Sequence, residues 1–401
     1  MGRIRLLVAW RAVLQALLYL GGILRPRLQS RRAPRRKRLA FQAYSAHLAQ
    51  GFAPVIAKLQ QEAPDLELHF LILPHPHFSF RSLWALRDFA RDALHVPGPN
   101  VRFFWQVLWQ RYDLLVCTDV YASFPLRRTR RVLLNHGAGV ASRFLEPHPL
   151  RKTVFDFDLV LVSGEADLEL LRRVCPEEFV AEKVVATGQP YLDRLYARGD
   201  SRAAYLRGLG LDDREPVVLV APSWRGAQAI DERQPRSFDA LIAALGRLDV
   251  QTIIKMHACS FNKAMVRGED WEARVRAHAQ DRVRVDNDID DISALRHADL
   301  LITDISSRAF NFMLLDKPVV AFCPDEVFVD PLDRERIELI RRGAYLARSV
   351  AEVEAVLEPA LRGRALADPE RAQVGRYCFA NPGGATDAVV AQLLRHIRGG
   401  A

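Results

Sequence analysis

Short apolar runs alternate with longer stretches in which apolar residues recur at helical spacing along most of this chain. Residues 300–302 form one such run, which is short enough for a buried parallel strand. Ser306 follows as the predicted N-cap of a helix, and Lys317-Pro318 ends that helix before a second apolar run at 319–322. This segment therefore predicts one β-α-β unit.

The start of the predicted helix has the chemistry of an anion site. It offers unpaired backbone N–H groups, the hydroxyls of Ser306 and Ser307, and the positive end of a helix dipole. These are the parts of a phosphate-binding site. A serine at such a position more often only caps its helix, so the local sequence leaves both interpretations open.

The alternation of strand and helix repeats on both sides of a polar connector at residues 201–215. Predicted strands lie at 66–73, 113–118, 132–135, 158–163 and 184–187 before the connector, and at 217–221 and 252–255 after it. Further predicted helices lie at 165–174, 238–245, 289–298 and 387–397. Repeated β-α units are typical of doubly wound parallel sheets. We therefore expect an α/β protein with two Rossmann-like domains facing a central cleft.

Domain boundaries follow from the breaks in this pattern. We expect a first Rossmann-like domain at 39–198 and a second one at 199–375. Residues 376–401 end in a helix that we expect to pack back across the domains. Residues 1–38 precede the pattern and differ from it in composition.

The N-terminal segment predicts contact with a membrane. Residues 6–24 are almost wholly apolar, and the stretch is interrupted by Arg11 and Gln15 on one helical face. A mid-span arginine is costly, so an amphipathic helix lying in the interface fits better than a span. No small-x-small cleavage site of a signal peptide follows. The basic cluster at 25–38 predicts binding to anionic lipid on the cytoplasmic face of a membrane. The protein would be bound there peripherally or through a single span.

The distribution of charge indicates which partners to expect, and the cysteines indicate the redox state of the compartment. The net charge is +9, but residues 1–38 hold eleven Lys and Arg and no acidic residue, so removing them leaves −2. A nucleic-acid-binding protein would carry its positive charge on the folded domains, so no nucleic-acid partner is expected. The five cysteines are scattered without a Cys-x-x-Cys pair, which indicates reduced thiols in the cytosol.

Polar residues follow several predicted strands, where ligands of parallel sheets bind. Asn135, His136 and Gly137 follow one strand, and Gln189 follows another. In the second half, the corresponding positions are held by Trp224, Arg225, His257, Asp304, Ser306 and Ser307. Each alone is a weak signal, because such residues are often turn, core or surface ion-pair residues. Their shared position at strand ends predicts one site.

The aspartates at 286, 288, 290 and 291 are close together in the sequence. They lack the central glycine and terminal glutamate of an EF-hand loop, so we interpret them as a solvated loop and expect no metal site.

The order of these motifs resembles the CDP-glycerol glycerophosphotransferases, which build teichoic-acid-like polymers. Asn135-His136-Gly137-Ala138-Gly139 stands in the place of the family's Trp-His-Gly-Thr-Pro. Residues 188–193 match Gly-x-Pro-x-x-Asp, 221–225 match Ala-Pro-Thr-Trp-Arg, 257–258 stand for His-Pro, and 302–307 match Ile-Thr-Asp-Tyr-Ser-Ser. The resemblance covers roughly residues 110–395. The departures, at Asn135, Ala138 and Gly139, lie on the side expected to bind the acceptor.

The resemblance implies a GT-B fold and a transferase of the cell envelope. The first domain would bind the acceptor and the second the donor nucleotide. A polyol phosphate, with glycerol phosphate favoured, would move from CDP-glycerol or a related CDP-polyol to a hydroxyl of a membrane-linked or polysaccharide acceptor, releasing CMP. The product would be a teichoic-acid-like or capsule polymer. No cofactor is expected.

The chemistry of this transfer assigns roles to the candidate residues. An alcohol that attacks phosphorus needs a base, positive charge at the leaving phosphate, and in-line positioning. His136 suits the base, because imidazole titrates near neutral pH. His257 and Arg225 suit the diphosphate, and Arg can grip it with two parallel hydrogen bonds. Asp304, Ser306 and Ser307 complete the predicted donor site.

Two alternatives remain at this point. A GT-B glycosyltransferase or nucleotide-sugar epimerase would share the fold and the phosphate site but cleave at a sugar carbon. Sugar transfer usually releases a nucleoside diphosphate instead of CMP. A membrane-bound scaffold without activity would retain nucleotide binding and lack turnover.

Overall fold

The computed structural model describes residues 36–73, 80–103, 106–107, 110–120, 129–138, 145, 153–223, 237–248, 250–261, 263, 266, 268–280, 282–304, 306–322, 331–361 and 370–399. The chain divides into two compact units. Unit 1 comprises Met1–Asp193 together with Gly384–Ala401, and unit 2 comprises Arg194–Gly383. The sequence placed the corresponding breaks at residues 198/199 and 375/376.

Unit 1 is built around a parallel sheet. Its strands are β1 (Arg38–Ala43), β2 (Glu67–Ile72), β3 (Val101–Phe103), β4 (Leu114–Cys117), β5 (Arg130–Leu134), β6 (Leu159–Val162) and β7 (Val184–Ala186). Its helices are α2 (Ala46–Gln50), α3 (Ala53–Glu62), α4 (Phe80–Asp92), α5 (Glu165–Val174), α6 (Glu177–Lys183) and α16 (Ala385–Arg398). The strand order is β3-β2-β1-β4-β5-β6-β7, and all described pairs are parallel. The predicted doubly wound sheet is therefore confirmed for this unit.

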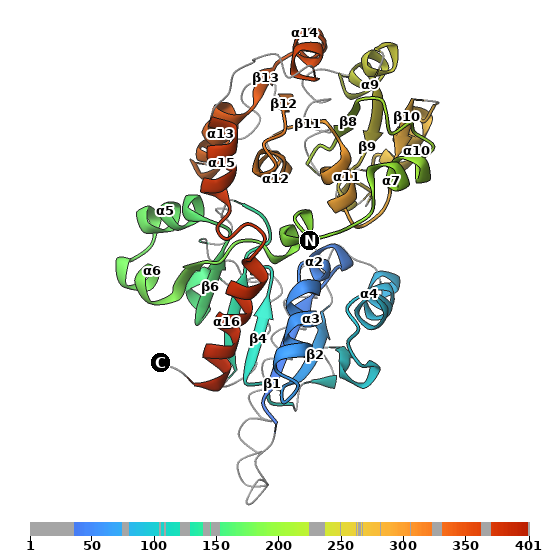
Figure 1. Ribbon diagram of the computed structural model, residues 1–401. Coiled ribbons are helices and arrows are strands. Elements are labelled where there is room, and N and C mark those ends of the chain that lie inside the picture. The colour runs from blue at the N-terminus through green and yellow to red at the C-terminus, as the bar shows by residue number, and fades with distance from the viewer. Residues whose placement is uncertain are drawn as a thin grey trace, which may run out of the picture. The chain divides into compact units, whose positions relative to one another are not determined.

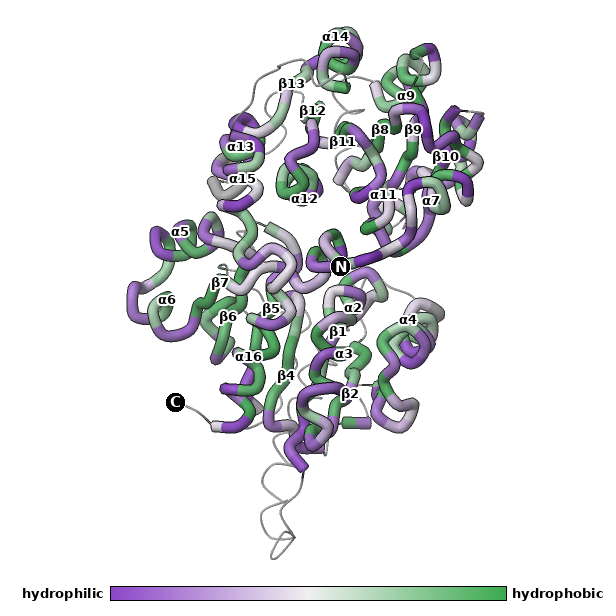
Figure 2. The backbone as a smooth tube through the Cα atoms, in the orientation of Figure 1, coloured by the Kyte–Doolittle hydropathy of each residue, from purple (hydrophilic) through white to green (hydrophobic). Residues whose placement is uncertain are grey.

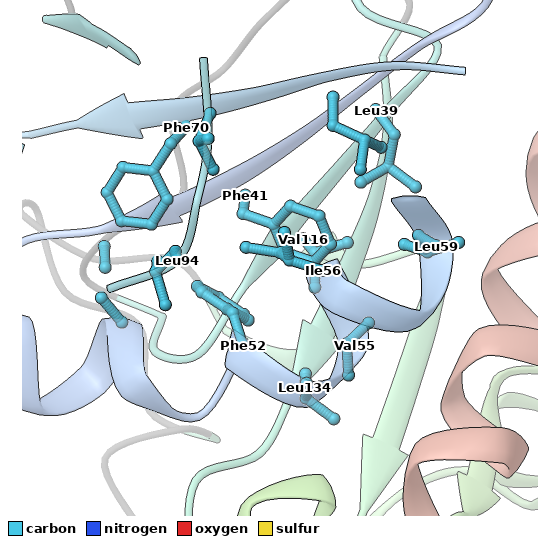
Figure 3. Packing of buried hydrophobic residues seen from close by; sticks show 14 of the residues in the cluster. Leu39, Phe41, Phe52, Val55, Ile56, Leu59, Phe70, Leu94, Val116 and Leu134 are labelled. Carbon is cyan, nitrogen blue, oxygen red and sulfur yellow. The ribbon is translucent and has the colours of Figure 1, made fainter. Parts of the chain in front are cut away.

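The core of unit 1 forms where alternate strand residues meet the apolar faces of α3 and α16. Phe41 and Phe70 on the strands pack with Phe52 and Ile56 of the helix region (Figure 3). The rings of Phe41 and Phe52 have centroids 5.0 Å apart. Strands β4 and β6 are apolar throughout, whereas the helices alternate between apolar and polar positions (Figure 2). This is the pattern expected when helices cover a buried parallel sheet.

Unit 2 repeats the architecture with its own sheet. Its strands are β8 (Val217–Val220), β9 (Gln251–Ile254), β10 (Val283–Val285), β11 (Leu300–Thr303), β12 (Val319–Phe322) and β13 (Tyr345–Ala347). Its helices are α7 (Arg202–Gly208), α9 (Ser237–Arg247), α10 (Trp271–Ala277), α11 (Ile292–His297), α12 (Arg308–Leu314), α13 (Pro331–Gly343), α14 (Val350–Leu361) and α15 (Glu370–Cys378). The order β10-β9-β8-β11-β12-β13 is again parallel throughout the described pairs (Figure 1).

The core of unit 2 lies between its sheet and helices α9, α10 and α14. Trp271 is 1% exposed and meets the ring of Phe238 edge-on, with centroids 5.3 Å apart. Helix α12 contacts β11 and β12, and α15 packs against α12. Arg308, the first residue of α12, lies at the end of β9, because its guanidinium donates to the Lys255 carbonyl at 3.5 Å.

The C-terminal helix belongs to unit 1, although all of unit 2 separates it from the rest of that unit in the sequence. Helix α16 lies in unit 1 and packs against α3 (Figure 1). Val389, Val390 and Leu393 of this helix belong to the unit 1 core. Asp193 fixes its start, because its carboxylate accepts the backbone N–H groups of Ala385 and Thr386 at 3.1 and 2.6 Å. The sequence predicted that this helix packs back across the domains; the structure assigns it to unit 1, and packing across both domains stays a prediction.

The last residues of the predicted basic segment are part of the sheet. Arg38 begins β1, and its backbone N–H donates to Asp113 at 2.8 Å. The Lys37 carbonyl accepts from the backbone of Glu67 at 2.9 Å. The segment predicted at 1–38 thus extends two residues too far, because apolar periodicity does not register the polar first residue of a strand.

The membrane-associating helix predicted at 6–24 lies outside the described residues, so it stays a prediction. Among the helices that the structure describes, none is both long and apolar enough to cross a bilayer. The predicted cleft between the two domains also stays a prediction.

Candidate functional site

His136 follows β5 and is oriented by the end of the neighbouring strand. Its Nδ1 lies 2.5 Å from the backbone carbonyl oxygen of Thr118, which follows β4. A carbonyl oxygen can only accept, so Nδ1 must carry the hydrogen. In the neutral ring, the lone pair is therefore on Nε2. This is the tautomer that a general base with a fixed ring requires.

His257 follows β9 and has the opposite arrangement. Its Nδ1 accepts the backbone N–H of Cys259 at 3.1 Å. A backbone N–H can only donate, so Nδ1 carries the lone pair and Nε2 carries the hydrogen. His257 is thus set to donate a hydrogen bond from Nε2, which suits contact with a phosphate oxygen. The two predicted catalytic histidines therefore differ in their chemistry.

The turn at 135–137 is held by residues from two further strand ends. The side-chain amide of Asn135 donates to the Gly137 carbonyl at 3.0 Å. Gln189, which follows β7, donates to the Asn135 carbonyl at 2.6 Å. The Ser163 hydroxyl donates to the Gly137 carbonyl and accepts from the side-chain amide of Gln189. Ser163 was not among the residues predicted from the sequence. Asn135, His136, Gly137 and Gln189 are thus brought together in unit 1.

In unit 2, Ser223 and Asp304 are hydrogen-bonded to each other between two neighbouring strands, at the point where the strand order reverses. Both oxygens of the Asp304 carboxylate accept from Ser223, one from its backbone N–H at 2.9 Å and the other from its hydroxyl at 2.6 Å. Ser223 follows β8 and Asp304 follows β11, which are the first strand of the unit and its neighbour beyond the reversal. Ligands of doubly wound sheets bind at such points. Burial raises the pKa of Asp304 above its ordinary value, against the effect of these hydrogen bonds.

The start of α12 differs by one residue from the prediction. The helix begins at Arg308, and Ser307 holds the N-cap position without a capping bond from its side chain. The hydroxyl of Ser306 instead accepts the backbone N–H of Arg308 at 3.3 Å. Ser306 is buried and Ser307 is half-buried. Assigned helix ends commonly shift by a residue when the first turn is tight.

The acidic segment at 286–291 is a chain of turns. The carboxylates of Asp286, Asp288 and Asp290 each accept a backbone N–H from two residues further along, at 2.9, 3.2 and 3.0 Å. Such turns compete with helix, which explains why α11 begins at Ile292 and the predicted start at 289 is wrong.

Basic side chains pair with the same segment. Lys255 lies 3.0 Å from Asp286, Arg194 2.5 Å from Asp290, and Arg308 3.2 Å from Asp291. Asp286 and Asp291 are buried, so the prediction of a solvated loop is wrong for them. Within the described ranges, no group of three or more His, Cys, Asp or Glu is arranged to hold a metal ion.

Trp224 and Arg225, predicted at the end of β8, lie outside the described residues, as does Gly139. The roles of the predicted site residues therefore stay predictions. The hydrogen bonds described above support some of these roles and change others.

Comparison with known proteins finds sequence relatives for part of this chain. Residues 136–328 match the sequence profile of the CDP-glycerol:poly(glycerophosphate) glycerophosphotransferases. A teichoic acid glycerol-phosphate transferase of Staphylococcus aureus is 31% identical over 176 residues, which cover 41% of this chain and 39% of that protein. A UDP-N-acetylglucosamine--N-acetylmuramyl-(pentapeptide) pyrophosphoryl-undecaprenol N-acetylglucosamine transferase of Phocaeicola vulgatus is 26% identical over 186 residues, covering 46% and 47%. The matches thus span less than half the length of either relative.

Solved structures show the same fold. The wall teichoic acid polymerase TagF is similar with a TM-score of 0.63 at 17% identity, covering 99% of this chain and 98% of that chain. A putative UDP-N-acetylglucosamine 2-epimerase from Listeria monocytogenes is similar with a TM-score of 0.60 at 16% identity, covering 91% and 97%. The fold is therefore GT-B-like, with two Rossmann-like domains. The resemblance predicted from the motifs is confirmed: residues 136–328 carry the sequence pattern of the CDP-glycerol:poly(glycerophosphate) glycerophosphotransferase family.

Proposed function

We propose that this protein transfers a polyol phosphate, with glycerol phosphate the favoured group, from a CDP-linked donor to a hydroxyl of a lipid-linked or polysaccharide acceptor. The family match over residues 136–328 supports the donor class. The observation that carries the chemistry is the hydrogen bond between His136 Nδ1 and the Thr118 carbonyl, which assigns the lone pair to Nε2. In this proposal, unit 1 activates the acceptor and unit 2 binds the donor.

The proposed reaction is a displacement at the phosphorus that bears the polyol. His136 Nε2 takes the proton of the acceptor hydroxyl as the oxygen attacks that phosphorus. The new bond joins the acceptor oxygen to this phosphorus, and the bond from phosphorus to the bridging oxygen breaks. CMP leaves with the bridging oxygen. Each turnover therefore consumes one donor, extends the acceptor by one polyol phosphate, and passes one proton to His136.

The donor contacts are proposed from the carboxyl edge of the unit 2 sheet. His257 donates from Nε2 to a phosphate oxygen, and the Ser307 hydroxyl, which makes no capping bond, adds a second donor. Arg225 supplies the positive charge and Trp224 a neighbouring surface. A carboxylate would repel a diphosphate, so Asp304 acts here by holding Ser223, the residue that precedes Trp224. No cofactor takes part in the proposed reaction.

We also propose that the protein works at the cytoplasmic face of a membrane. The apolar stretch at 6–24 and the basic cluster beside it support binding to anionic lipid, either peripherally or through a single span. A membrane-linked acceptor would then be met at the surface to which the protein is bound. The polymer could be a teichoic-acid-like or a capsule polymer.

The second candidate is a GT-B glycosyltransferase or nucleotide-sugar epimerase. The similarity to an N-acetylglucosamine transferase and to an epimerase fold favours it. It would use a UDP-linked donor and break a bond at a sugar carbon. The two candidates thus differ in the nucleotide they release.

Product analysis with a panel of CDP- and UDP-linked donors tests the proposal. The full chain is incubated with CDP-glycerol, CDP-ribitol or UDP-N-acetylglucosamine and a synthetic lipid-anchored glycerol phosphate as acceptor. The proposal predicts release of CMP and growth of the acceptor by one polyol phosphate. Release of UDP, or epimerisation of the sugar, would replace it by the second candidate. Nucleotide binding without any product would favour the scaffold.

A further inference from the structure

Ser163 and Gln189 form a buried hydrogen-bonded bridge beneath the turn that carries His136. The Ser163 hydroxyl donates to the Gly137 carbonyl at 2.6 Å and accepts from Gln189 Nε2 at 2.7 Å. The second hydrogen of the same Nε2 is directed to the Asn135 carbonyl at 2.6 Å. Every donor and acceptor in this set has a complementary role, so the orientation of the Gln189 amide is settled by chemistry.

The bridge forms hydrogen bonds to the turn on both sides of His136. Asn135 and Gly137 are the two chain neighbours of His136, and the carbonyl of each accepts from the bridge. Gly137 has a φ of 105°, a conformation that favours glycine and that must be held against alternatives. Two fixed carbonyls leave the backbone of the turn little freedom to rotate.

The bridge is itself anchored. Ser163 is 0% exposed, and its backbone N–H donates to the Asp167 carboxylate of α5 at 3.1 Å. Gln189 is 9% exposed and follows Gly188, whose φ is 88°. The ring of His136 is held by the hydrogen bond from its Nδ1 to the Thr118 carbonyl. Residues after β4, β6 and β7 therefore jointly fix the position of a side chain carried by β5.

We propose that Ser163 and Gln189 are positioning residues for His136, which act through the carbonyls of Asn135 and Gly137 and keep its Nδ1 within reach of the Thr118 carbonyl. This inference rests on the proposed role of His136 as the base. Neither residue contacts substrate in this assignment. Loss of either one lets the turn rotate, and the ring then exchanges between its two tautomers.

The test compares Ser163→Ala and Gln189→Met with a matched control in the same unit. Thr129→Val is that control: the Thr129 hydroxyl is buried and donates to the Tyr112 carbonyl at 3.0 Å, at the opposite end of β5. All three variants lose side-chain donors to backbone carbonyls. Only the first two lose them beside His136.

Two measurements on the full chain separate positioning from simple stability. The first is CMP release from CDP-glycerol with the lipid-anchored acceptor, resolved into kcat and KM. Misplacement of a catalytic group by about 1 Å costs on the order of 10²-fold, so kcat should fall by about 10- to 100-fold while KM for the donor changes little. The second is the nitrogen NMR spectrum of labelled histidine, with His136 assigned from a His136→Asn variant.

The expected result is that His136 has the Nδ1–H tautomer in the parental protein and a mixture in both bridge variants, whereas Thr129→Val alters neither kcat nor the tautomer. A folded Ser163→Ala protein that retains the parental kcat and tautomer would overturn the proposal. If Ser163→Ala does not fold, Gln189→Met decides the question by the same two criteria. A shifted tautomer in a protein that never releases CMP would sustain the positioning role and reject the proposed function.

Discussion

The backbone partners of His136 and His257 set the two rings in opposite tautomers, and this difference predicts opposite kinetic effects. His136→Ala should leave the affinity for CDP-glycerol nearly unchanged and lower turnover by about 10²- to 10⁴-fold, because it removes a positioned base. His257→Ala should raise the donor's dissociation constant, because a contact made in the ground state is lost. Calorimetry with CDP-glycerol and an assay of CMP release measure both effects.

His396→Ala is the control for these variants. His396 also belongs to unit 1, and its Nδ1 also pairs with a backbone carbonyl, that of Gln392 at 3.0 Å, but on α16. Its loss should leave both donor affinity and turnover unchanged. A stable His136→Ala protein with parental turnover would remove His136 from the mechanism.

Asp304 predicts a pH dependence of stability. Burial raises its pKa in the folded protein above the ordinary 3.8 of an unfolded chain. The folded protein therefore binds the proton of Asp304 more tightly than the unfolded chain does. The protonated group stabilises the fold at low pH, and this contribution is lost as the pH rises from 3.8 through the raised pKa. Asp304→Asn cannot titrate, and its amide can still pair with both groups of Ser223.

Urea unfolding of the parental protein and of Asp304→Asn between about pH 4 and pH 7 tests this prediction. The parental free energy of unfolding, relative to the variant, should decrease as the pH rises. A difference that stays constant or increases with pH would contradict the assigned direction of the pKa shift.

At the scale of elements, Ser306 and Ser307 at the start of α12 make different hydrogen bonds, although the sequence predicted the same role for both. Ser306 accepts the Arg308 N–H, so Ser306→Ala should cost about 0.5–1.5 kcal/mol of stability, the net worth of one hydrogen bond. The Ser307 side chain makes no capping bond. Ser307→Ala should therefore leave stability unchanged and weaken CDP-glycerol binding by about 1 kcal/mol, the worth of one hydrogen bond. Unfolding curves and calorimetry on both variants decide whether the roles divide in this way.

The close approach of α15 to α12 depends on Gly375. A Cβ at this position would lie 2.7 Å from backbone atoms of Met313 and Leu314, and backbone cannot move aside as a flexible side chain can. Gly375→Ala should destabilise unit 2 by about 1–3 kcal/mol through overpacking. Gly208→Ala is the matched control, because nothing lies within 4 Å of its added Cβ.

The control should be neutral or gain about 0.4–1 kcal/mol, since alanine restricts the unfolded chain. Denaturant unfolding measures both variants. Equal stability of the two would show that α12 and α15 separate at little cost.

At the scale of the whole molecule, the structure moves the boundary of the proposed membrane segment. Lys37 and Arg38 bond to the sheet, so a deletion through residue 38 would damage β1. Deletion of residues 1–35 removes the apolar stretch and most of the basic cluster while sparing these bonds. The truncated protein should bind CDP-glycerol as the full chain does and lose its flotation with anionic vesicles. Flotation equal to that of the full chain would place the membrane contact elsewhere.

The strands were more predictable than the helices, because the length and apolar character of a buried strand are local properties. The buried runs at β4, β6, β8 and β11 and the helix α5 were identified on this basis. Strands β1, β3, β10 and β13 were missed. The last three span three residues each, which leaves little room for a pattern, and β1 begins inside the basic segment that was predicted to bind a membrane. The start of α11 was misplaced because aspartate side chains satisfied backbone N–H groups that a helix would otherwise have used.

The sequence by itself determined the α/β class, the two-domain division and the order of the family's motifs, since these are carried by neighbouring residues. Only the tertiary structure decided which strand ends meet. The pairing of Ser163 with Gly137 and of Ser223 with Asp304 joins residues on different strands, and the sheet order sets it. The return of α16 to unit 1 likewise depends on burying Leu393 against a core begun at the other end of the chain. Such contacts arise from burial and backbone hydrogen bonding across long sequence separations, which no local pattern encodes.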